Sequence, residues 1–166
     1  MSPLLNKDTY EFLVPGTATS LSVIRWVVTR LARASGLSPE QVDQLEMAVD
    51  EACANVVEHA YKELSQKPPL HILINNSPEA FTVDIVDQGK TFDFAGYQAP
   101  KFPDHWEEGN TRGVGLYIIQ SCADDVHYDS LPNAGNRMRL VKRHRVDTVS
   151  DSAPVTSQLA VSETAL

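Results

Sequence analysis

Two periods of hydrophobic residues run along this chain, and they separate predicted helices from predicted strands. From Leu21 to Leu31 the hydrophobic residues recur every three or four positions, which predicts an amphipathic helix. Thr19 or Ser20 is a suitable N-cap for this helix. Gly36 is expected to follow its last turn, because glycine adopts the left-handed conformation that often ends a helix.

A second and longer helix is predicted to begin at Ser38-Pro39-Glu40-Gln41, which has the residues of a capping box with proline in the first turn. Its hydrophobic positions form one stripe: Val42, Leu45, Val49, Ala52, Cys53, Val56 and Ala60. At about 100° per residue, Glu51 and Asn55 point away from this stripe and are neighbours on the polar face.

The remaining ordered segments alternate in the manner of strands. The expected strands are Tyr10–Val14, Leu70–Asn75, Ala80–Val86, Val126–Ser130 and Asn136–Lys142. Strands combined with amphipathic helices predict an α+β two-layer sandwich, in which a mostly antiparallel mixed sheet packs against the helices.

The region from about Phe94 to Asn110 has no clear period and is predicted to be a long loop or lid. Gly113 is expected to open a short helix after it. Beyond Arg145 the chain is rich in Ser, Thr, Asp and Val, which is typical of a disordered tail. We therefore expect one domain over residues 1–145 and a tail over 146–166.

Composition narrows the classes of function. The chain has 166 residues and a net charge of −8, so it lacks the basic surface that nucleic acids or anionic membranes attract. It shows no apolar run of membrane-spanning length and no secretory signal, so a cytoplasmic location is the default. Cys53 and Cys122 are expected to be buried thiols rather than a disulfide. Trp26 is expected to pack in the core and Trp106 in the lid.

The first candidate site is the pair Glu51 and Asn55, one helical turn apart. An Asn carboxamide oxygen can supply one ligand to Mg²⁺, and a carboxylate one turn earlier can accept a proton from an attacking hydroxyl. Taken alone, such a pair is more often a solvated helix face.

Two further segments gain meaning only in combination with this pair. Asp87-Gln88-Gly89 places a carboxylate where a strand ends, in position to accept a hydrogen bond from the exocyclic amine of adenine. Asp and Gly also dominate ordinary turns. Arg112-Gly113-Val114-Gly115-Leu116 offers backbone N–H groups and a guanidinium to phosphate at a helix start. This segment is neither a Walker A loop nor a dinucleotide fingerprint.

In this order the motifs resemble those of the serine-kinase anti-sigma factors of the RsbW and SpoIIAB type, within the GHKL ATPase superfamily and its Bergerat fold. The likeness covers about residues 10–143. The matching segments are Glu51–Asn55 extended by His59–Glu63 (N box), Asp87–Phe94 (G1 box) and Gly113–Ile119 (G2 box).

The resemblance implies the cofactors ATP and Mg²⁺ and a role for each residue. Asn55 would bind Mg²⁺, Asp87 would recognise adenine beside Gly89, and Gly113 and Gly115 would hold phosphates. Glu51 would be the base for phosphoryl transfer to a serine.

The resemblance also implies partners. The acceptor serine would lie on an anti-anti-sigma protein of the STAS class, the kinase would bind a sigma factor, and two copies would form a homodimer through the first helix region, where Arg25 lies. Three alternatives stay open: a module that binds ATP and sequesters a partner without chemistry, a partner-switching kinase that binds no sigma factor, and the catalytic domain of a sensor histidine kinase.

Overall fold

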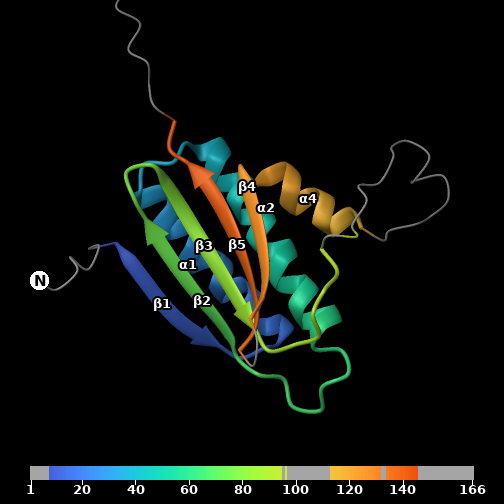
Figure 1. Cartoon of the computed structure of the whole chain (residues 1–166). Coiled ribbons are helices and arrows are strands. Elements are labelled where there is room, and N and C mark those ends of the chain that lie inside the picture. The colour runs from blue at the N-terminus through green and yellow to red at the C-terminus, as the bar shows by residue number, and fades with distance from the viewer. Residues whose placement is uncertain (1–7, 95, 97–112, 132–133, 146–166) are drawn as a thin grey trace, which may run out of the picture.

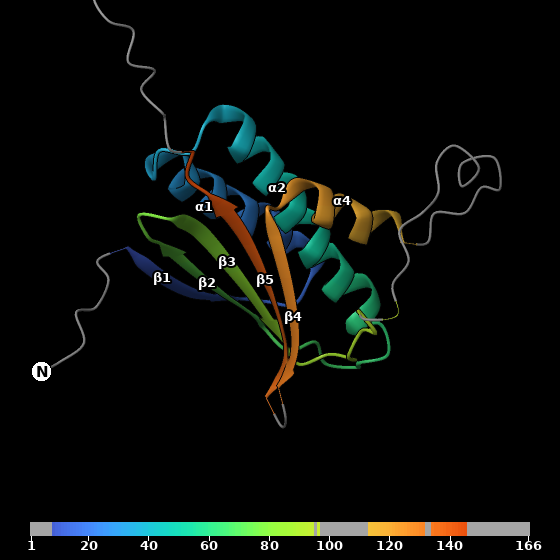
Figure 2. The same cartoon turned by 45° about the horizontal axis from the view of Figure 1, so that its top comes forward.

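The computed structural model describes residues 8–94, 96, 113–131 and 134–145, which form a sheet and a layer of helices on one face of it (Figures 1 and 2). The strands are β1 (Thr9–Val14), β2 (Leu70–Asn76), β3 (Ala80–Asp87), β4 (Asp125–Leu131) and β5 (Gly135–Arg143). The helices are α1 (Leu21–Ala34), α2 (Pro39–Asn55) and α4 (Val114–Cys122), with a 3₁₀ turn η1 (Ala18–Ser20) and a π-helical turn η2 (Val56–Ala60).

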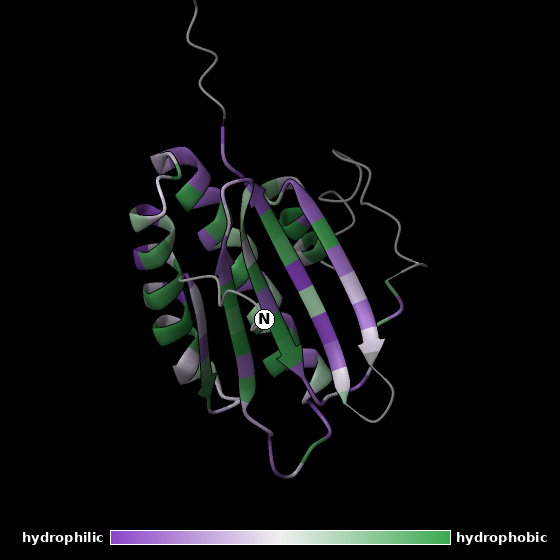
Figure 3. Ribbon diagram, turned by 60° about the vertical axis from the view of Figure 1, so that its left-hand side comes forward, coloured by the Kyte–Doolittle hydropathy of each residue, from purple (hydrophilic) through white to green (hydrophobic). Residues whose placement is uncertain are grey.

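The strand order in the sheet is β1-β2-β3-β5-β4, and each of the four neighbouring pairs is antiparallel. The expected two-layer fold is therefore confirmed, but the sheet is antiparallel throughout the described strands and not mixed. Hydrophobic and hydrophilic bands alternate along the strands in Figure 3, as a sheet with only one covered face requires. The predicted lid lies largely outside the described residues, and so does the predicted tail.

Local sequence signals set the ends of the helices. Ser38 and Gln41 form both bonds of the capping box, each 3.2 Å long. Gly36 has a φ of 91° just after α1, as expected for the residue that ends a helix. At the start of α1 the expected cap is absent, since the Ser20 side chain makes no capping hydrogen bond. Its backbone is already helical because the 3₁₀ turn leads directly into α1.

The hydrophobic stripe of α2 is buried as predicted from Val42 to Cys53. Beyond Asn55 the helix widens, and the N–H of Tyr61 donates to the carbonyl of Val56 over 2.9 Å, an i→i+5 bond. The wider turn shifts the register by one residue, so Val57 is buried in place of Val56, which is only half-buried.

The expectation for Trp26 is wrong, because its side chain is 68% exposed. The buried residues of α1 include Ile24 and Val28. Trp26 lies two positions from each of them, about 200° around the helix, and therefore points to solvent. Trp106 lies outside the described residues. Cys53 and Cys122 are buried free thiols, as expected.

Candidate functional site

Glu51 and Asn55 lie in the last turn and a half of α2, and both side chains are half-buried. Within the described part of the chain, neither side chain makes a hydrogen bond or an ion pair to another side chain or to the backbone. Both polar groups are therefore available to a ligand.

The N-terminal end of α4 packs directly on Glu51. A Cβ placed on Gly115 would lie 2.8 Å from Cδ and 3.2 Å from Cγ of Glu51, and closer still to Oε1. Only glycine leaves room for the carboxylate at this distance. The fold thus brings the glycine of the third motif against the carboxylate of the first, 64 positions away along the chain.

The surroundings of Glu51 raise the pKa of its carboxyl group. Burial is the largest cause, and the negative charges of Glu58 and Asp50 add to it, while His59 opposes them. A raised pKa makes the ionised carboxylate a stronger proton acceptor, which suits a general base.

A surface groove of about 520 Å³ opens beside Glu51, between α1, α2 and α4. On its wall Arg25 forms an ion pair with Asp50, 2.8 Å between Nη1 and Oδ2. The groove is lined by Ala18, Leu21, Ser22, Arg25, Met47, Asp50, Glu51, Ala54 and Ile118. Glu51 therefore borders a groove that extends to α1.

Asp87 is the last residue of β3 and is only 4% exposed. Its Oδ1 accepts hydrogen bonds from the backbone N–H of Gly89 at 2.7 Å and from Nδ2 of Asn136 at 3.1 Å. Burial raises the pKa of Asp87, and these two hydrogen bonds oppose the rise. Among the described residues both bonds fall on Oδ1, which leaves Oδ2 for a ligand.

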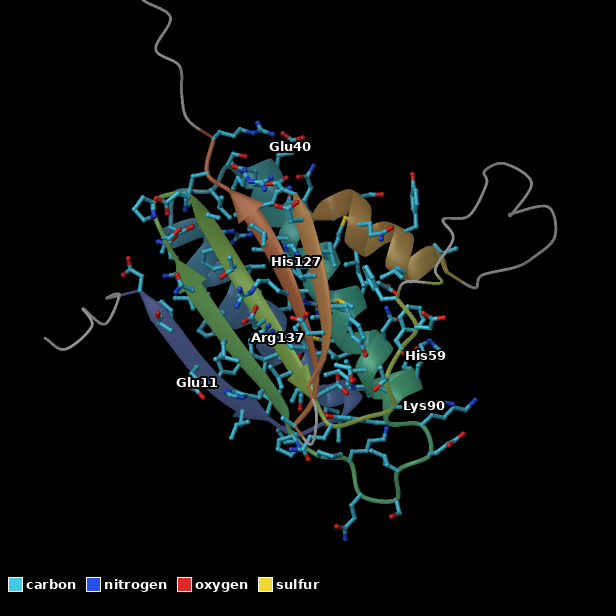
Figure 4. All side chains as sticks on the ribbon, viewed as in Figure 1. Glu11, Glu40, His59, Lys90, His127 and Arg137 are labelled. Carbon is cyan, nitrogen blue, oxygen red and sulfur yellow. The ribbon has the colours of Figure 1, made fainter. Side chains whose placement is uncertain are left out.

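Gly89 lets two parts of the backbone approach each other. A Cβ on this residue would lie 2.6 Å from the Cβ of Ala60, and the N–H of Lys90 donates to the carbonyl of Ala60 over 3.1 Å. Figure 4 shows Lys90 and His59 at this end of the helix. The turn after Asp87 is thereby joined to the end of the helix that carries Glu51 and Asn55.

Sequence reasoning missed the residues that hold this turn from the other side. Asn136 and Tyr128 come from β5 and β4; Thr91 donates to Oδ1 of Asn136 at 2.9 Å, and the N–H of Phe92 donates to the Tyr128 hydroxyl at 3.0 Å. The ring of Phe94 stacks on that of Tyr128 with 5.8 Å between centroids. Only the pairing of Asp87 with Asn136 across β3 and β5 reveals this arrangement.

Gly113 precedes α4 with a φ of 81°, a conformation that favours glycine. It directs the chain into the helix, whose first turn contains Val114 and Gly115, while Leu116 is buried in the core. The first N–H groups of a helix have no partner within it and attract anions. Arg112, the remaining residue of this motif, lies outside the described residues.

The site suits a nucleotide with a divalent cation better than a metal held by protein alone. Among the residues that the structure describes, no group of three or more His, Cys, Asp or Glu side chains gathers as a metal site. The Asn55 carboxamide offers one oxygen, and Mg²⁺ commonly completes its shell with water and substrate phosphates. The residues present therefore fit Mg²⁺ bound together with a nucleotide.

Comparison with known proteins agrees with this geometry. Residues 14–142 match the family described as histidine kinase-like ATPase domain. The serine-protein kinase RsbW of Bacillus subtilis is 31% identical over 125 residues, covering 73% of this chain and 78% of that protein. RsbW of Bacillus licheniformis is 28% identical over 84% of this chain and 90% of its own.

A solved structure shows the same fold. The crystal structure of the RsbU and RsbW domains of Rv1364c from Mycobacterium tuberculosis aligns with a TM-score of 0.56 at 14% identity, over 81% of this chain and 32% of that one. The fold, the matched domain and the similarity to the two Bacillus proteins lead to one conclusion: the chain belongs to the histidine kinase-like ATPase family and, within it, to the RsbW family of serine-protein kinases.

Proposed function

We propose that this protein is an ATP-dependent serine-protein kinase that phosphorylates an anti-anti-sigma protein of the STAS class and binds a sigma factor in a partner-switching system. The observation that carries the proposal is the contact between Glu51 and Gly115. In this contact the Glu51 carboxyl group, whose pKa is raised, lies against a helix end of the kind that binds phosphate, which supports a role for Glu51 as proton acceptor. Similarity to the Bacillus RsbW proteins supports the choice of serine as acceptor.

In this proposal each motif binds one part of Mg²⁺–ATP. Oδ2 of Asp87 would accept a hydrogen bond from the exocyclic amine of adenine beside Gly89, and Asn55 would supply an oxygen to Mg²⁺. The backbone of Gly113-Val114-Gly115-Leu116 binds the phosphates, with Arg112 adding charge. When bound, ATP would supply the phosphoryl group, and Mg²⁺ would offset the negative charge of the phosphates.

Glu51 acts on the acceptor. The serine oxygen forms a bond to the γ-phosphorus, the bond from that phosphorus to the β,γ-bridging oxygen breaks, and the serine proton passes to the Glu51 carboxylate. The groove beside Arg25 and Asp50 admits the acceptor segment. Positioning supplies much of the acceleration, because the transferred group needs little covalent help from the protein.

A second copy of the chain is the expected partner at the opposite side of α1. β1 is an edge strand among the described strands, and a groove of about 460 Å³ separates it from α1. Exposed hydrophobic side chains lie on this side of the molecule: Tyr10 and Trp26 line the groove, and Val23 lies one turn before Trp26 on α1. Pairing of two such surfaces would cover them and support the homodimer.

The cytoplasm is the proposed location, where sigma factors act. Among the described residues, no helix combines the length and apolar character needed to cross a membrane.

The decisive experiment is intact-mass spectrometry of STAS-class proteins from the same genome after incubation with this protein, Mg²⁺ and ATP. We expect a mass gain of one phosphoryl group on the partner, and its loss with Glu51→Gln. Glu40→Gln is the matched control, because Glu40 is an exposed carboxylate in the first turn of the same helix and belongs to none of the three motifs. An unchanged rate of phosphorylation with Glu51→Gln would show that Glu51 is not the base. ATP binding with no phosphoryl transfer to any STAS protein would favour the module that sequesters a partner without chemistry.

A further inference from the structure

Asn136 is almost completely buried, at 1% exposure, at the beginning of β5 and directly opposite Asp87. Its carboxamide makes three hydrogen bonds. Nδ2 donates to Oδ1 of Asp87 and to the carbonyl of Gly89, both at 3.1 Å, and Oδ1 accepts from the hydroxyl of Thr91 at 2.9 Å. One side chain therefore contacts three residues of the turn 87–91.

The orientation of this carboxamide follows from its partners. Both groups facing Nδ2 are acceptors, a carboxylate oxygen and a backbone carbonyl. The opposite orientation would place the amide oxygen against two other oxygens in a buried environment, which is costly. A carboxamide satisfies all three partners, whereas a carboxylate of the same shape lacks the two donors.

These hydrogen bonds fix the orientation of the Asp87 carboxylate. Its Oδ1 receives two donors, from Gly89 and Asn136, and these donors favour the ionised form against the effect of burial. With Oδ1 occupied in this way, rotation of the carboxylate would break two hydrogen bonds. Oδ2 is thereby held in one direction as an acceptor.

We infer that Asn136 is a positioning residue that keeps Asp87 ionised and turned, so that the site selects purines with an amino group at position 6 over purines with an oxo group there. This inference rests on the proposed ATP site and adds to it a residue outside the three motifs. An ionised Asp87 accepts a hydrogen bond from a 6-amino group and repels a 6-oxo group.

The other titratable groups that face Asp87 stay neutral near neutral pH. Tyr61 comes from the end of η2 and Tyr128 from β4; burial, together with the charge of Asp87, raises the pKa of both phenols. Neither phenol therefore competes with Asp87 as a negative charge in this pH range.

The test compares binding of Mg²⁺–ATP and Mg²⁺–ITP to the full chain by calorimetry at pH 8 and pH 6. We expect Asn136→Asp to weaken ATP binding about 10- to 100-fold at pH 8, the usual effect of losing a hydrogen bond to a charged group, with a much smaller effect on ITP. At pH 6 a proton shared by the two carboxylates should restore part of the ATP affinity. Wild-type affinity for ATP should not rise on acidification.

Asn76→Asp is the matched control, because it adds the same charge at the opposite end of the sheet and keeps an oxygen for His144. Thr91→Val is a second variant, which leaves Asn136 in place but removes the donor to its oxygen; we expect a smaller loss of selectivity for ATP. Thr91→Val keeps the test informative if Asn136→Asp unfolds, as circular dichroism would show.

Two results would overturn the inference. One is wild-type affinity and selectivity in Asn136→Asp at both pH values. The other is an equal loss of ATP and ITP binding without recovery at pH 6, which would make Asn136 a support of the fold alone. Failure of the proposed function looks different: wild-type protein would not bind ATP, or Asp87→Asn would bind it normally.

Discussion

The contact between Gly115 and Glu51 can be tested without nucleotide or partner, by a double-mutant cycle on the stability of the protein. Gly115 lies in the first turn of α4 and is not among the described glycines with positive φ. Alanine therefore fits its backbone conformation, and replacing a helical glycine with alanine stabilises a protein by about 0.5–1 kcal/mol. Any departure from this gain measures the contact with Glu51.

The size of the departure follows from the geometry. The new Cβ would lie 2.8 Å from Cδ of Glu51 and closer still to Oε1, whereas ordinary contact begins at 3.4 Å, so the carboxyl group must move by more than about 0.6 Å. Overpacking of this kind costs about 1–3 kcal/mol, and the half-buried Glu51 side chain can yield, which favours the lower end. We expect Gly115→Ala to be nearly neutral in the wild-type protein and stabilising by about 0.5–1 kcal/mol in Glu51→Ala.

The assay is urea unfolding at pH 7 of the wild type, both single variants and the double variant, from which we expect a coupling energy of about 1 kcal/mol. Ser121→Ala is the control, since Ser121 is an exposed residue near the end of the same helix and should change stability equally with and without Glu51. An equal gain from Gly115→Ala in both backgrounds would refute the contact. It would also remove the main support for Glu51 as the base.

Four further predictions follow from other parts of the structure. Glu58→Gln should lower the pKa of Glu51 and shift the acid limb of the phosphorylation rate to lower pH, because the Glu58 charge raises that pKa; a pH–rate profile tests this. Asp87 has a raised pKa in the folded state, so its contribution to stability is present at low pH and lost as pH rises through that pKa. Asp87→Asn should therefore make stability less dependent on pH in thermal melts from pH 4 to 8, and it should abolish ATP binding. Lys142→Met should lower the free energy of unfolding, measured with urea, by about 2 kcal/mol, because the buried ammonium donates hydrogen bonds to Gln44, Asp124 and the carbonyl of Cys122. Trp26→Glu should turn the proposed homodimer into monomers in sedimentation analysis, whereas an unchanged mass would place the interface elsewhere.

Much of the fold could be predicted because its signals are local. The capping box at Ser38, the left-handed glycine after α1 and the alternation of the strands depend on residues within a few positions of one another. Such signals act through backbone geometry and nearest neighbours, which the order of residues specifies directly. The same reasoning identified all three motifs, since each lies within a single turn or helix end.

Local reasoning failed where a neighbouring element determined the outcome. The burial of Val57 depends on the π-helical turn, and the exposure of Trp26 depends on which face of α1 meets the sheet. Hydrophobicity alone assigns a tryptophan to the core, although an exposed one is a common feature of surfaces that bind another chain.

The sequence by itself determined the two-layer class, the helix ends and the segments that supply Glu51, Asp87 and Gly115. Only the tertiary structure decided that Gly115 lies against Glu51 and that Asn136 holds Asp87 from another strand. The physical reason is that a hydrogen bond or a steric contact depends on distances of a few ångströms. Between residues far apart in the chain, such distances are set by strand register and helix packing, not by spacing in the sequence.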